Sequence, residues 1–108
     1  MSHFSYLDTL VATIASRVGG DPKLSYTAKL LKRGPAKIAK KLGEEGVEVA
    51  ISAAQGSREE VVSESADLLF HLLTLWQAMG VKPAEVMAEL ERRQSQSGIA
   101  EKASRMAT

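Results

Sequence analysis

A chain of 108 residues with 44% apolar and 25% charged residues has the composition of one soluble globular domain. Its formal net charge of +1 gives no general attraction to nucleic acid or to a membrane surface, so neither is expected as a partner. The absence of cysteine excludes disulfides, thiolate zinc sites and cysteine nucleophiles. No secretory or transmembrane segment is recognisable, and we therefore expect a cytoplasmic protein.

The first third of the chain predicts two helices. Apolar residues recur every three or four positions from Phe4 to Val18, which is the pattern of an amphipathic helix, and the Gly-Gly-Asp-Pro run at 19–22 ends it. Ser25 is a suitable N-cap for a short helix over 28–33.

Three further helices are predicted beyond that point. Pro35 stands where a first helical turn tolerates proline, and the helix is expected to reach about Gln55. A capping-box pattern at 57–60 starts another helix that runs to Met79 before a glycine, and a last helix spans about 83–93.

No strand pattern and no internal repeat is apparent, so the fold is predicted to be all-α, a bundle of four to five helices. Residues 1–94 are expected to form the domain. Residues 95–108 have no strong apolar stripe and are predicted to be a flexible or ligand-ordered tail.

Five carboxylates lie on the two long helices in positions that favour clustering. One helix carries an E-E-x-x-E segment and the next an E-x-x-D segment, formed by Glu44, Glu45, Glu48, Glu64 and Asp67. Residues three or four apart share a helix face, and a short turn makes the two helices antiparallel neighbours. That much negative charge in a small space requires a counter-cation or raised pKa values.

The helix over 58–79 is apolar around most of its circumference, with Glu64, Asp67 and His71 in one polar line. It should therefore be largely buried, and its acids need a hydrogen-bonding, basic or metal partner. An alternative is that the acids form ordinary surface ion pairs, such as Lys40 with Glu44 and Lys41 with Glu45.

Oxygen ligands favour a hard cation, chiefly Mg²⁺ with Mn²⁺ as a substitute. A carboxylate-held Mg²⁺ usually bridges phosphate oxygens, so the pattern points to phosphate chemistry. His71 is predicted to be a hydrogen-bonded interior residue, with a role at the metal or substrate as the alternative.

Phosphates also need cations, and the segment before the acids supplies Lys29, Lys32, Arg33, Lys37, Lys40 and Lys41. These residues could equally form a solvated face. There is no P-loop spacing, and two histidines do not suggest a nucleophilic triad.

Four segments of the chain together resemble a known family. SYTAKLL, GPAKIAKKLGEEGVEVAISA, ESADLLFHLL and SGIAEKASR are similar to the phosphoribosyl-ATP pyrophosphohydrolases, which are MazG-like all-α nucleotide pyrophosphohydrolases. The resemblance implies hydrolysis of N1-(5-phosphoribosyl)-ATP between its α and β phosphates in histidine biosynthesis. It also implies a homodimer, and the absence of cysteine together with the short length favours the stand-alone form of the enzyme.

The resemblance assigns roles to individual positions. It implies that Glu45, Glu48, Glu64 and Asp67 are metal ligands, with Glu44 in an outer or water-orienting role. The candidate substrate contacts that it implies are Ser25, Tyr26, Thr27, Lys37, Lys40, Lys41, Lys102 and Arg105.

Two other functions are compatible with the sequence. One is a pyrophosphohydrolase that clears non-standard nucleoside triphosphates, since the acidic motifs alone specify only the wider superfamily. The other is a non-catalytic helical interaction module whose acids form salt bridges.

Overall fold

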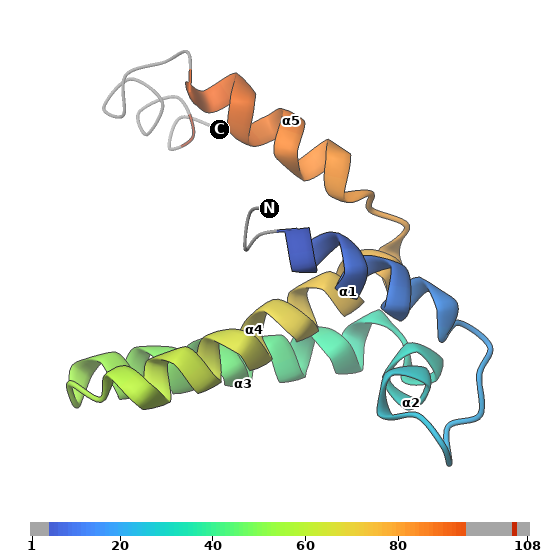
Figure 1. Ribbon diagram of the computed structural model, residues 1–108, viewed down its shortest axis with the longest axis horizontal. Coiled ribbons are helices and arrows are strands. Elements are labelled where there is room, and N and C mark those ends of the chain that lie inside the picture. The colour runs from blue at the N-terminus through green and yellow to red at the C-terminus, as the bar shows by residue number, and fades with distance from the viewer. Residues whose placement is uncertain (1–4, 95–104, 106–108) are drawn as a thin grey trace.

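The computed structural model describes residues 5–94 and residue 105, and all regular structure in that part of the chain is helical (Figure 1). The all-α prediction is therefore confirmed. The five helices are α1 (Ser5–Ser16), α2 (Tyr26–Arg33), α3 (Pro35–Ala54), α4 (Arg58–Met79) and α5 (Pro83–Gln94). None of these described helices is long and apolar enough to cross a membrane.

Two serine caps begin helices where the sequence predicts them. The Ser25 hydroxyl accepts a hydrogen bond from the Ala28 N–H at 3.1 Å, and the Ser57 hydroxyl accepts one from the Glu60 N–H at 3.3 Å. Each bond satisfies one of the N–H groups that the first turn of a helix leaves without a partner. The caps thus set the starts of α2 and α4.

Glycines in the left-handed region end the two long helices. Gly56 and Gly80 have φ values of 74° and 70°. The N–H that follows each glycine reaches back to the last helical turn, from Ser57 to the Ser52 carbonyl at 3.1 Å and from Val81 to the Trp76 carbonyl at 2.9 Å. The short turn at Gly56 folds α4 back along α3, so that the two long helices lie antiparallel (Figure 1).

A small core holds α1 and α2 against one end of the α3–α4 pair. Ile14 of α1, Leu30 of α2 and Ile38 of α3 are almost completely buried, together with Leu73 and Thr74 of α4. Because α2 packs on both α3 and α4, the short helix bridges the two long helices at this end of the pair.

The prediction that α4 is largely buried was wrong for the single chain. Among its residues only His71, Leu73 and Thr74 are buried, whereas Val62, Leu69 and Met79 are exposed. The reason is that α1, α2 and α3 cover only part of its circumference, and the remaining apolar side of α4 has no helix over it in the described structure.

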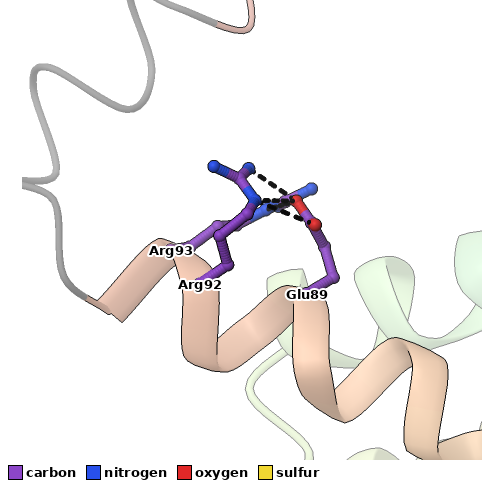
Figure 2. A network of polar contacts seen from close by, with 3 residues as sticks. All are labelled: Glu89, Arg92 and Arg93. Atoms are coloured by element: carbon purple, nitrogen blue, oxygen red, sulfur yellow. Dashed lines mark hydrogen bonds and ion pairs between the residues drawn. The ribbon is translucent and has the colours of Figure 1, made fainter.

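The helix α5 leads away from the α3–α4 pair and has no buried residue (Figure 1). Its C-terminal half carries a local ion network, in which Glu89 accepts hydrogen bonds from Arg92 and Arg93 (Figure 2). The bonds from Arg92 and then Arg93 lower the pKa of Glu89 to about 2. These i,i+3 and i,i+4 pairs support the last turns of a helix that has little tertiary packing.

Candidate metal and phosphate site

Three carboxylates from facing sides of α3 and α4 meet in one cluster. Glu45 of α3 and Glu64 and Asp67 of α4 each offer an oxygen, and these oxygens lie within 4.8 Å of one another. Glu64 and Asp67 are three residues apart and so project from one face of α4, while the antiparallel packing brings Glu45 opposite them. The site thus depends on the lateral alignment of the two helices.

The other two predicted acids lie next to this cluster. Glu48 is exposed one turn beyond Glu45 on α3 and is outside the three-residue group, although its charge still acts on Glu64. Glu44 is exposed and lines a neighbouring pocket. The structure therefore separates the five predicted acids into a close group of three and two flanking residues.

The pKa of Glu64 reports on the crowding of negative charge. Partial desolvation raises this pKa most, followed by a hydrogen bond with the Glu45 carboxyl group and by the charges of Glu45, Asp67 and Glu48. Within the described part of the chain, Glu89 is the acid that forms ion pairs, and neither Lys40 nor Lys41 is paired with these clustered acids. The surface ion pairs considered as an alternative are therefore not observed.

The arrangement suits a small divalent cation. Mg²⁺ is coordinated by oxygens at about 2.0–2.1 Å. The oxygens of the cluster, within 4.8 Å of one another, could converge on one such ion by adjustment of their side chains. An all-oxygen donor set is also the set that Mg²⁺ and Mn²⁺ prefer.

The basic residues form a pocket that adjoins the acids. Arg33, Lys37, Lys40, Lys41 and Glu44 line a pocket of about 140 Å³. The three lysines and Glu44 follow one face of α3, and Arg33 comes from the end of α2. Arg33 belongs to the predicted basic run but not to the predicted substrate contacts, although its position four residues before Lys37 is a usable signal. The pocket concentrates positive charge about one helical turn from the carboxylate cluster.

The three predicted substrate contacts around the start of α2, which are Ser25, Tyr26 and Thr27, have different surroundings. Ser25 is engaged as the cap of α2, and Ser25 and Thr27 line a polar pocket of about 550 Å³ beside α1. Tyr26 instead faces α4, where its ring centroid lies 6.3 Å from that of Phe70 and 6.4 Å from that of His71. Tyr26 is thus the one of these three residues that packs against α4.

His71 is buried, and its Nδ1 lies 2.7 Å from the Asp67 carbonyl oxygen. The prediction of an interior hydrogen-bonded histidine is confirmed. The bond links His71 directly to the residue that supplies one of the clustered carboxylates.

Two of the predicted substrate contacts, Lys102 and Arg105, belong to the C-terminal tail. Lys102 lies outside the described residues. Arg105 is described and is exposed.

Five helices with a carboxylate cluster between the two longest define a MazG-like all-α protein. The model of the family described as phosphoribosyl-ATP pyrophosphohydrolase matches residues 7–94. The chain belongs to this family and is a hydrolase. The interpretation as a non-catalytic module is thereby ruled out.

Relatives of similar length share most of the sequence. A protein of Methylobacterium radiotolerans named phosphoribosyl-ATP pyrophosphatase is 62% identical over 99 residues, which cover 92% of each chain. A protein of Novosphingobium aromaticivorans with the same name is 58% identical over 97% of this chain and 98% of its own. One from Cereibacter sphaeroides is 57% identical over 94% of this chain and 98% of its own.

Proposed function

We propose that the protein hydrolyses N1-(5-phosphoribosyl)-ATP between the α and β phosphates, giving phosphoribosyl-AMP and pyrophosphate, the second step of histidine biosynthesis. The family and the names of the relatives support the substrate. The single observation that carries the chemistry is the group of three carboxylates on the α3–α4 pair, which form no ion pair with a basic residue of the described part of the chain. We place this reaction in the cytoplasm.

Glu45, Glu64 and Asp67 would hold a Mg²⁺ ion, or Mn²⁺ in its place, with Glu48 approaching from the next turn of α3. A bound divalent ion supplies charge neutralisation for the phosphates and lowers the pKa of a coordinated water. In the reaction a water oxygen bonds to the α phosphorus, the bond from that phosphorus to the α–β bridging oxygen breaks, and one water proton is released. Glu44, which follows the basic residues on α3, would have an outer role, as a ligand beyond the close group or in orienting the water.

The basic pocket would hold the departing pyrophosphate. Lys37, Lys40 and Lys41 lie on the side of α3 that leads into the acids, and Arg33 adds a fork of N–H donors from α2. Positive charge in this position stabilises the negative charge that collects on the leaving group. Ser25, Thr27, Lys102 and Arg105 remain proposed contacts to the rest of the substrate.

A substrate panel tests the reaction. Purified protein with Mg²⁺ should release pyrophosphate from phosphoribosyl-ATP far faster than from ATP, dUTP or dCTP. The reverse ranking would favour the alternative, a pyrophosphohydrolase that clears non-standard nucleotides.

Charge-removing variants test the site. Glu45→Gln, Glu64→Gln and Asp67→Asn should each reduce kcat by a factor of about 10² or more, because each removes a ligand while keeping the side-chain shape. Glu91→Gln on the exposed surface of α5 is the matched control and should keep full activity. Glu48→Gln, outside the close group, should cost less than Asp67→Asn.

We further propose that the protein is a homodimer. The radius of gyration is 16.0 Å, whereas a compact domain of this length has about 13 Å. Val47, Ile51, Val62 and Leu69 on the α3–α4 pair are exposed, and such apolar surface on a single chain is typical of an interface. Light scattering should give twice the mass of the chain. The variant Val62→Glu should shift the protein toward the monomer. If the parent protein is a monomer at all concentrations, this proposal is rejected.

A further inference from the structure

Three aromatic rings meet at the contact between α2 and α4, one helical turn after Asp67 along α4. Tyr26 and Phe70 are nearly parallel, with an interplanar angle of 24° and centroids 6.3 Å apart. His71 meets Phe70 edge to face at 5.2 Å and Tyr26 at 6.4 Å. A separation of 6.3 Å is near the upper end of the range for stacked rings, so Tyr26 and Phe70 are only loosely packed on one another.

The hydrogen bond of His71 determines which ring nitrogen carries the proton. A carbonyl oxygen only accepts, so Nδ1, at 2.7 Å from the Asp67 carbonyl, must be the donor. In the neutral ring Nε2 is then an acceptor. Nε2 is buried and has no hydrogen-bond partner among the described residues.

An unpaired buried acceptor costs stability, and a phenylalanine in the same position would avoid this cost. His71 is more than nine-tenths buried, so bulk water does not satisfy the nitrogen. His71 therefore carries an unused acceptor in a ring that packs against Tyr26 and Phe70. A purine with an exocyclic N–H group complements both features.

We propose that Tyr26, Phe70 and His71 form the purine subsite of the enzyme. The base stacks on Tyr26 and Phe70 and donates its exocyclic N–H to His71 Nε2. Tyr26 is about half exposed at the first position of α2, and its ring swings outward when the base enters. This inference rests on the proposed function for the identity of the nucleotide.

The position of the subsite along α4 agrees with the length of a nucleotide. Asp67 and His71 are four residues apart, which corresponds to about 6 Å of helix rise. A ribose joins the base of a nucleotide to its α phosphate. A base at His71 thus leaves the α phosphate near Asp67 and the other clustered carboxylates.

The binding test uses protein labelled with ¹⁵N-histidine and three metal-free probes. Adenosine 5′-monophosphate has the exocyclic amino group, purine riboside 5′-monophosphate lacks it, and ribose 5-phosphate has no base. Adenosine monophosphate should shift the Nε2 resonance of His71 and bind roughly 3- to 10-fold more tightly than purine riboside monophosphate, as expected for one added hydrogen bond. Ribose 5-phosphate should leave the resonance unchanged.

Equal affinity for the two purine nucleotides, or an Nε2 resonance that no nucleotide moves, would overturn the subsite. Hydrolysis of phosphoribosyl-ATP is measured on the same preparation. If the enzyme turns over but no nucleotide shifts the Nε2 resonance of His71, the subsite is rejected and the proposed function stands. If the resonance shifts but phosphoribosyl-ATP is not hydrolysed, the subsite is supported and the proposed function is contradicted.

Two variants provide a second test. His71→Phe keeps the ring but removes the acceptor, and it should raise KM about 5-fold, by more than it lowers kcat. Tyr26→Leu should raise KM roughly 10-fold through lost stacking. Tyr6→Leu, which removes an exposed tyrosine from α1, is the matched control and should leave KM unchanged. If His71 only fills space, His71→Phe will have the KM of the parent protein and an equal or greater thermal stability.

Discussion

Glu45 of α3 and Glu64 of α4 bring carboxyl oxygens within 4.8 Å of each other across the helix pair, and desolvation followed by this contact raises the pKa of Glu64. Two ionised carboxylates at this separation repel each other, whereas a proton on one of them allows a hydrogen bond between the two. The metal-free protein therefore favours a proton at this position, and a divalent cation would replace it. Proton and metal ion compete for the same pair of oxygens.

The first prediction concerns pH in the absence of metal. Because the folded pKa of Glu64 is raised above its ordinary value of 4.5, the folded state retains a proton that the unfolded chain has lost. The contribution of Glu64 to stability is therefore most favourable at low pH and declines as pH rises from about 4.5 through the raised pKa. Denaturant unfolding in EDTA across this range should show the decline, and Glu64→Gln should remove it.

The affinity for Mg²⁺ should change in the opposite direction over the same interval. Deprotonation of Glu64 frees the ligand, so binding measured by calorimetry should strengthen as pH rises and be accompanied by proton release. Binding that is independent of pH from 4.5 to 7 would contradict the shared-proton interpretation.

The second prediction links the metal to stability. At 100 times its Kd, Mg²⁺ should stabilise the fold by about 2.7 kcal/mol, since the unfolded chain has no assembled site. Asp67→Asn should lose most of this gain but should be no less stable than the parent protein in EDTA, because it removes like-charge repulsion. Thermal unfolding with and without Mg²⁺ measures both effects, and Glu91→Gln should respond to Mg²⁺ like the parent protein.

The third prediction compares two glycines on either side of the basic pocket. Gly34, between α2 and α3, has φ 92° and ψ 173°, a conformation that only glycine adopts readily. Gly34→Ala should destabilise the protein by about 1–3 kcal/mol and weaken substrate binding by displacing Arg33 relative to Lys37.

Gly43 in the middle of α3 is the contrasting case. A Cβ there meets nothing within 4 Å, so Gly43→Ala should stabilise the isolated chain by about 1 kcal/mol through helix propensity. Urea unfolding of the two variants provides the comparison. Loss of stability in Gly43→Ala would indicate that a second chain or a ligand approaches this side of α3.

The fourth prediction concerns Glu89, whose pKa is lowered to about 2 by Arg92 and Arg93. A lowered carboxylate pKa contributes stability above the unfolded value of about 4.5, and this contribution is lost as pH falls toward 2. Both arginines and Glu89 are substantially exposed, so the effect on global stability should be small. NMR titration of Glu89 should give the low pKa, and Arg92→Gln should raise it without unfolding the core.

Local sequence signals determined the helices of this protein. The caps at Ser25 and Ser57, the left-handed glycines and the prolines at helix starts each act within a few residues, so the boundaries of all five helices follow from the chain with little error. The acidic motifs were also visible, because spacings of three and four residues place side chains on one helix face whatever the helix packs against.

Tertiary structure decided which of those residues meet. The sequence alone did not distinguish Glu48 from Glu45, but the alignment of α3 against α4 brings Glu45 to Glu64 and Asp67 and leaves Glu48 outside. The apolar circumference of α4 indicated burial, yet the described chain leaves Val62 and Leu69 exposed. Hydrophobicity specifies that a surface will be covered, whereas the helix that covers it is determined by long-range packing.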